Sequence, residues 1–186
     1  MTTCCSIREE HIPEVLDIAN TQLGKHYLKA EEIREYMKNA TQCVDVALNE
    51  EGKVVGFNMV NTMYNKGLER FIIKGKDEII NYFPDKSFVH WHKILCIHKD
   101  HQKKGIGTQL FEFTYDRINP ITEFWIGCAW ASGTKAHVEN IFLSHGFIQK
   151  TKIDNYWYED SFLKNYQCAN CGNPPCECSA FIFIKK

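Results

Sequence analysis

Apolar residues recur at helical spacing in two segments near the N-terminus. Within 9–22 they stand at i, i+3, i+4 and i+7, namely Ile12, Val15, Leu16 and Ala19. Within 29–40 the same stripe is made by Ile33, Tyr36, Met37 and Ala40. This spacing places the apolar side chains on one face of a helix, so the pattern predicts two consecutive amphipathic helices.

The period then changes to two, which is typical of strands. Alternation over 43–48 and the run 53–64 flank a glycine-containing turn, which predicts an antiparallel hairpin. Composition and turn signals assign the other segments: a short strand near 6–8, a short helix at 75–83, strands at 88–98, 121–130, 147–159 and 179–186, and helices at 105–118 and 134–146. The order β-α-α-β-β-(α)-β-α-β-α-β-β predicts an α/β fold on a mixed sheet.

Bulk composition narrows the functional classes. The chain has 186 residues, 44% of them hydrophobic and 24% charged, with a formal net charge of -1. This is the composition of an ordinary globular domain, and no linker-like stretch divides 1–186. The charge favours neither a nucleic acid nor a membrane surface as partner. The first ten residues contain no apolar run, so the cytoplasm is the expected location.

A glycine-containing loop stands between a predicted strand and a predicted helix. Gly105 and Gly107 lie within the stretch 99–110, and Lys103 and Lys104 precede them. Backbone N–H groups at such a loop and at the following helix N-terminus can bind a phosphate group. The spacing is neither that of a P-loop nor that of a dinucleotide-binding motif. From the loop alone, a plain turn before a buried helix is an open alternative.

Two sequence blocks together resemble a known family. "Q102-K-K-G-I-G" resembles the [Q/R]-x-x-G-x-[G/A] acyl-CoA signature of the GNAT superfamily of N-acyltransferases. About forty residues downstream, "N140-I-F-L-S-H-G-F147" resembles the end of that superfamily's asparagine-bearing helix. The resemblance covers roughly 4–165. It implies a GNAT-like, mostly antiparallel central sheet flanked by helices, with acetyl-CoA as co-substrate.

The resemblance also implies which residues contact acetyl-CoA. The pyrophosphate would be held by the backbone of Gln102, Lys103, Lys104, Gly105, Ile106, Gly107 and Thr108. The pantetheine arm would pair with the preceding strand at about Leu95, Cys96 and Ile97, and Asn140 would contact the cofactor from the next helix. One amide of that strand would polarise the thioester carbonyl.

The reaction requires two proton transfers, one from the attacking amine and one to the departing thiolate. The family often places a carboxylate on the strand before the loop, but 88–98 contains His90 and His92 and no Asp or Glu. A histidine is a competent base at neutral pH, and either one can instead be a half-buried sheet residue. The family's usual tyrosine donor is replaced by Phe142, which leaves solvent, Tyr115 or Ser144 to protonate the thiolate.

Four cysteines lie between the last two predicted strands, outside the ordinary pattern of the family. Cys168, Cys171, Cys176 and Cys178 have the spacing Cys-x2-Cys-x4-Cys-x-Cys. Four thiolates can close a tetrahedral structural zinc site. Reduced or disulfide-bonded cysteines and an iron–sulfur centre are the alternatives.

Taken together, these features predict an acetyl-CoA-dependent N-acetyltransferase. Its acceptor would be a primary amine of a small molecule or a peptide, and the chain would act as a monomer or a homodimer. A non-catalytic acyl-CoA-binding or partner-binding module is the main alternative, and a domain gated by redox or metal sensing at the cysteines is a third. Candidate aromatic residues for the acceptor cleft are Tyr64, Trp91, Trp130 and Tyr156.

Overall fold

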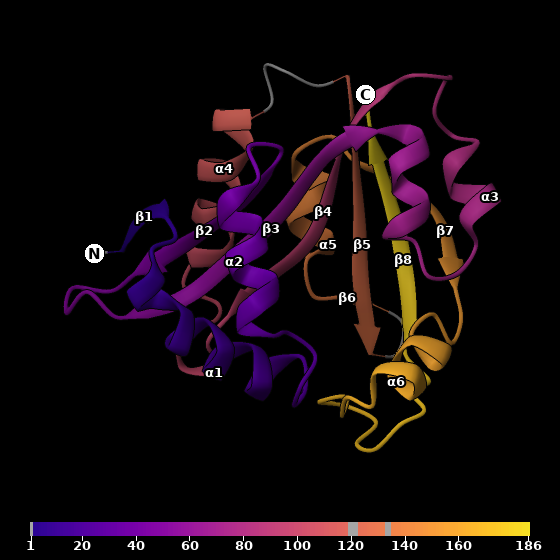
Figure 1. The fold of residues 1–186 in the computed structure, drawn as a ribbon. Coiled ribbons are helices and arrows are strands. Elements are labelled where there is room, and N and C mark those ends of the chain that lie inside the picture. The colour runs from indigo at the N-terminus through magenta and orange to yellow at the C-terminus, as the bar shows by residue number, and fades with distance from the viewer. Residues whose placement is uncertain (1, 119–122, 133–134) are drawn as a thin grey trace.

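One central sheet organises the structure, a computed structural model that describes residues 2–118, 123–132 and 135–186 (Figure 1). The strands are β1 Thr3–Ser6, β2 Gln42–Leu48, β3 Val54–Tyr64, β4 Phe88–Ile97, β5 Phe124–Ser132, β6 Lys135–Ala136, β7 Ile148–Ile153 and β8 Ser179–Lys185. The helices are α1 Ile12–Gln22, α2 Ala30–Lys38, α3 Lys76–Ile80, α4 Ile106–Ile118, α5 Glu139–Ser144 and α6 Tyr158–Lys164.

The strand order is β1-β2-β3-β4-β5-β8-β7, and β6 pairs with the end of β5. All of these neighbours are antiparallel except β4 and β5, which are parallel. The predicted fold class, a mixed and mostly antiparallel sheet with flanking helices, is therefore confirmed. No helix in the described part of the chain combines the length and apolarity needed to cross a bilayer.

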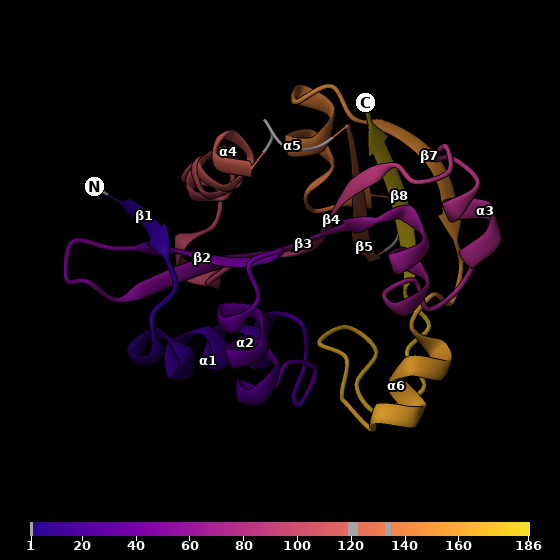
Figure 2. The same ribbon diagram turned by 45° about the horizontal axis from the view of Figure 1, so that its top comes forward.

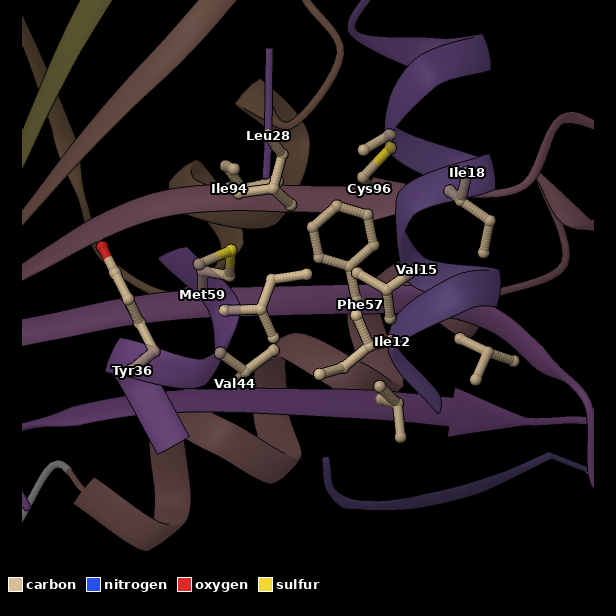
Figure 3. Packing of buried hydrophobic residues seen from close by; sticks show 14 residues of the cluster. Ile12, Val15, Ile18, Leu28, Tyr36, Val44, Phe57, Met59, Ile94 and Cys96 are labelled. Atoms are coloured by element: carbon tan, nitrogen blue, oxygen red, sulfur yellow. The ribbon is translucent and has the colours of Figure 1, made fainter. Parts of the chain in front are cut away.

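Helices cover both faces of the sheet. In Figure 2, α1 and α2 lie on one side of β2–β4, while α4 and α5 lie on the other. Ile12, Val15 and Ile18 of α1 pack onto Phe57 and Cys96 of the sheet (Figure 3). Each such buried aliphatic side chain contributes about 1.5–3 kcal/mol, so the apolar stripe of α1 fixes this helix to the strands.

A buried carboxylate attaches the opposite helix, α4, to the sheet. Asp45 of β2 is fully buried and accepts hydrogen bonds from the Arg117 guanidinium at 2.5 and 2.6 Å. It also accepts a bond from the Thr114 hydroxyl at 2.7 Å, and Thr114 in turn accepts one from the Asn58 amide. Since a buried charge is tolerated only when it is paired and hydrogen-bonded, this network holds α4 in one position on the sheet.

Three boundaries differ from the sequence prediction. The first strand is Thr3–Ser6 rather than 6–8. The predicted helix 134–146 is helical only from Glu139, because Lys135 and Ala136 pair with the end of β5 instead. Position 134 lies outside the described residues. Positions 121 and 122, at the start of the predicted strand 121–130, lie outside them as well.

The predicted strand 147–159 is the third difference, because it divides into β7 and α6. Asn155 has a left-handed φ of 53°, which ends the extended run after Ile153. Glu159 and Asp160 then lie in the first turn of a helix, where acidic side chains are favoured by the helix dipole.

Candidate active site

The candidate site begins where the two parallel strands separate. Val89–His92 of β4 pair with Phe124–Gly127 of β5, and beyond these residues the strands diverge (Figure 1). A β-bulge lies at this point, because Met59 and Val60 of β3 oppose Ile94 and His92 and leave Lys93 as the extra residue. A bulge bends its strand and increases the local twist. The β5-facing backbone edge of 93–97 therefore has no partner among the described strands.

A cavity of about 740 Å³ occupies the space between the diverging strands. Its lining includes the glycine loop and α4, the α1–α2 connection and the segment after α6. The β4 portion of its lining runs from His92 to Ile97, and the β5 portion from Cys128 to Trp130. The cavity therefore joins the predicted cofactor loop to a second, separate group of residues.

The glycine loop takes a conformation that exposes its backbone amides. Lys103 and Gly105 have left-handed φ values of 58° and 78°. Reversals of this kind between helical residues form anion-binding concavities, and glycine accepts them without steric cost. The Gln102 amide group donates hydrogen bonds to the Ile97 carbonyl at 3.0 Å and to Gln22 at 2.9 Å. This side chain fixes the loop to the end of β4 and to α1.

Most of the predicted cofactor residues lie on the cavity wall: Leu95, Cys96, Ile97, Gln102, Lys103, Gly105, Gly107, Thr108 and Asn140. Two of the predicted residues do not. Lys104 donates its ammonium group to the Asp100 carbonyl at 2.8 Å, and Ile106 is buried against Leu110. A backbone role in the loop does not require their side chains at the cavity.

The two predicted catalytic histidines differ in their surroundings. His90 is fully buried, its Nδ1 lies 2.6 Å from the Thr62 hydroxyl, and its Nε2 lies 3.0 Å from the Ile118 carbonyl. It is absent from the cavity lining. Burial lowers the pKa of His90 to about 4. This is the environment of a histidine that ties the sheet to the end of α4.

His92 instead lines the cavity at the point of strand divergence. Its ring contacts Phe111 and Phe142, with centroid distances of 5.5 and 5.2 Å. Its Nε2 is buried without a hydrogen-bond partner among the described residues. Burial lowers the pKa of His92 to about 3, so the ring is neutral at physiological pH and has one free acceptor or donor.

Tyr115 and Ser144, the two residues considered for thiolate protonation, are absent from the cavity lining, and so is Phe142, which stands at the family's tyrosine position. Phe142 is fully buried against Gly127, where an added Cβ would come within 2.5 Å of its ring. Tyr115 accepts a hydrogen bond from Lys185, and Ser144 donates to the Ile141 carbonyl. The sequence position of the family's usual tyrosine is thus a packing position in this chain.

Sequence reasoning missed a set of ring-bearing residues on the cavity wall. Tyr27, Trp157, Tyr166 and His137 line it, together with Trp130, which the sequence analysis had named, and we call these five residues the aromatic end of the cavity. Tyr27 and Tyr166 make an edge-to-face contact at 5.1 Å. These residues come from loops and helix ends, where side chains follow no regular hydrophobic periodicity that a sequence analysis could detect.

Other named aromatic residues have different places. Trp91 lies in the core, and Tyr64 is 62% exposed. Tyr156 is buried and accepts a hydrogen bond from the Ile73 amide. Burial raises the pKa of Tyr166, with a smaller contribution from the Asp160 carboxylate, so its phenol keeps its proton at neutral pH. The Tyr166 hydroxyl has no hydrogen-bond partner among the described residues.

The four C-terminal cysteines converge beside this aromatic end. Their sulfur atoms all lie within 4.8 Å of one another. Cys168 and Cys176 also line the cavity, so the cysteine cluster and the candidate site share a wall.

Diverging parallel strands beside a glycine loop at a helix N-terminus are the arrangement that the resemblance to acyl-CoA-dependent transferases implies. A family model described as the Acetyltransferase (GNAT) family matches residues 12–119. The chain therefore belongs to the GNAT acetyltransferase family, whose co-substrate is acetyl-CoA. No curated protein matches the chain.

Solved structures show the same fold at low sequence identity. Arabidopsis thaliana NAA60 in complex with acetyl-CoA has a TM-score of 0.69 at 9% identity, with 100% of this chain and 98% of that chain covered. The Escherichia coli ribosomal-protein-S18-alanine N-acetyltransferase has a TM-score of 0.65 at 14% identity, with 99% and 92% covered. Arylalkylamine N-acetyltransferase 2 from Aedes aegypti has a TM-score of 0.61 at 15% identity, with 99% and 98% covered.

Acid is expected to destabilise the fold through the two buried histidines. Their folded-state pKa values of about 4 and about 3 lie below the ordinary 6.5, so the unfolded chain binds protons first as the pH falls. The free energy of unfolding then drops between pH 6.5 and 4, by about 2 kcal/mol per histidine at pH 5.

Chemical denaturation at pH 7.5 and pH 5 measures this loss. In a His90→Gln variant the difference between the two pH values should shrink by about 2 kcal/mol. An equal pH dependence in His90→Gln and the parent protein contradicts the assignment.

Proposed function

We propose that the protein transfers the acetyl group of acetyl-CoA to a primary amine by direct attack within a ternary complex. The acceptor is an amine of a small molecule or of a peptide or protein. One observation carries the proposal: the same cavity is lined by the unpaired edge of β4, by the glycine loop and by the residues of the aromatic end. Such a cavity can hold both substrates at once, and their proximity supplies much of the catalysis.

The cofactor half of the cavity uses backbone groups. The amides of 102–108 and the N-terminus of α4 receive the pyrophosphate, while Lys103 adds positive charge. The unpaired edge of Leu95–Ile97 hydrogen-bonds the pantetheine arm in place of a neighbouring strand. A β4 amide near the bulge stabilises the oxyanion that develops on the thioester carbonyl.

The reaction forms a carbon–nitrogen bond and breaks a carbon–sulfur bond. The attacking nitrogen must lose a proton, and the departing thiolate must gain one. His92 accepts a hydrogen bond from the amine or from a water beside it, because its buried Nε2 is otherwise unpartnered. Its low pKa makes it a weak base, so solvent carries the proton away.

Tyr166 is the proton donor that we propose for the thiolate. It lines the cavity, and a phenol can donate its proton to a thiolate. In this proposal Tyr166 donates the proton that the family usually supplies from a tyrosine at the position of Phe142. The same proposal takes the chain to act as a single domain in the cytoplasm.

A second function is an acyl-CoA-binding module without turnover. The observation that favours it is the composition of the cavity wall, where the described lining residues include neither Asp nor Glu. The two functions predict the same affinity for coenzyme A. They differ in whether an amine releases free thiol from acetyl-CoA.

Coenzyme A binding should depend on Gly107. A Gly107→Glu substitution places a carboxylate at the first turn of α4, where the pyrophosphate would bind, and should weaken binding about 100-fold or more. Gln109→Glu adds the same charge to an exposed position of the same helix and should have little effect. Calorimetric titration with coenzyme A measures both. Equal affinities in the two variants contradict the placement of the pyrophosphate.

Turnover should depend on His92 and not on His90. With acetyl-CoA and a panel of aryl, alkyl and peptide amines, thiol release is followed by a colorimetric reagent. His92→Gln should lower kcat by about tenfold or more at unchanged coenzyme A affinity, because the hydrogen bond that orients the amine is lost. His90→Gln should lower thermal stability and leave kcat unchanged. Coenzyme A binding without thiol release for any amine supports the binding module instead.

A further inference from the structure

The sulfur atoms of the C-terminal cysteines have the separations of a tetrahedral metal site. The Sγ–Sγ distances are 3.4 Å for Cys171–Cys178, 3.8 Å for Cys168–Cys178 and 4.0 Å for Cys171–Cys176. Zinc–sulfur bonds of about 2.3 Å in a tetrahedron place the sulfurs roughly 3.8 Å apart. A disulfide would need about 2.05 Å. The donor set therefore fits a closed zinc–thiolate site.

The surrounding backbone is organised for such a site. Cys168 and Gly172 exchange two backbone hydrogen bonds, at 2.8 and 2.9 Å, and Gly172 has a left-handed φ of 82°. The Asn170 amide donates to the Cys168 sulfur at 3.4 Å. The Cys176 amide donates to the Ser161 hydroxyl of α6 at 2.8 Å. Hydrogen bonds to ligand sulfurs and their backbone orient the ligands of metal sites.

The same segment is joined to the connection between α1 and α2. The backbone amide of Gln167 donates a hydrogen bond to the Lys25 carbonyl, and the backbone amide of Ala169 donates one to the Leu23 carbonyl, both at 3.0 Å. These two bonds lie on either side of Cys168. Figure 2 shows the segment after α6 reaching toward α1 and α2. A pair of loops that are distant in sequence thus becomes one continuous wall.

Gly24 allows the two loops to approach each other closely. A Cβ at this position would lie 1.7 Å from the Gln167 carbonyl oxygen, and its φ is 134°. No other residue fits without separating the two loops. The wall built in this way carries Leu23, Tyr27, Tyr166, Cys168 and Ala169, all of which line the cavity.

We propose that Cys168, Cys171, Cys176 and Cys178 bind one Zn²⁺ ion, and that the metal-ordered segment forms the acceptor-binding wall by docking onto the α1–α2 connection. The second half of this inference rests on the proposed acetyltransferase function. All four ligands come from the chain, so the ion has no open position and its role is structural. Its effect falls mainly on the acceptor amine, because the metal-ordered segment carries lining residues other than the glycine loop to which coenzyme A is assigned.

Metal content tests the site without any assay of activity. The purified full-length protein should contain about one zinc per chain, and exchange with Co²⁺ should give the visible absorption of a tetrahedral thiolate complex. Cys171→Ser changes the exposed ligand and should lose the metal. Cys5→Ser, on the distant β1, should retain it. Metal-free protein that also gives no Co²⁺ spectrum overturns the proposal.

Hydrogen exchange tests the docking, again without turnover. Removal of zinc by a chelator, or by Cys171→Ser, should increase exchange at the Gln167 and Ala169 amides. The KM for the acceptor should rise about tenfold or more, because a displaced wall no longer positions the amine. Coenzyme A affinity should not change. If metal binds and exchange at these amides is unaffected by its removal, the docking role is wrong.

Gly24→Ala separates docking from metal binding. This variant should keep its zinc and its coenzyme A affinity, and should show the same exchange at Ala169 and the same rise in acceptor KM as the metal-free protein. Gly52→Ala is the matched control, since Gly52 also has a left-handed φ, of 79°, but an added Cβ there meets nothing within 4 Å. An acceptor KM equal in the two variants contradicts the proposal.

Discussion

The separation of β4 from β5 is the feature on which the rest of the site depends. A parallel strand pair normally satisfies its backbone groups along its whole length. Here the extra residue Lys93 turns β4 away after His92, and the backbone of the following residues is left to face a cavity. The cost of that unpaired edge is offset only when another hydrogen-bonding group occupies it, which makes the edge a ready site for an extended amide-containing cofactor.

The neighbouring elements keep this opening in place. Cys96 and Ile94 pack under α1 and α2 on one face, while Leu95 and Ile97 pack against the cluster of α4 on the other. Lys93 itself forms an ion pair with Glu32 of α2 at the rim of the cavity. Because β4 is held by side chains on both faces, it does not need β5 to stay extended. The Asp45 network holds α4, and with it the glycine loop, at a fixed distance from the open edge.

The sequence named most of the loop and strand residues that line the cavity, but it missed most of the aromatic residues on the same wall, for a physical reason. Gly105 is informative because its left-handed φ of 78° favours glycine, and its place between a strand and a helix is typical of an anion-binding loop. Tyr27 and Tyr166 give no such signal, since they lie in irregular segments that meet only through tertiary hydrogen bonds. The histidines show the same limit: alternation places His90 and His92 on one face, but only the contacts with Thr62 and Ile118 distinguish a bonded side chain from a free one.

The position of β8 has a consequence for how the chain assembles. This strand is the last of the sheet along the chain, yet it lies between β5 and β7, and its residues from Ala180 to Ile184 are all buried. During synthesis β5 and β7 emerge from the ribosome before β8, so the backbone edges that pair with β8 in the folded chain are still open. The aromatic core beneath them closes only when the final segment inserts. Until then the nascent protein exposes apolar core surface that chaperones can bind.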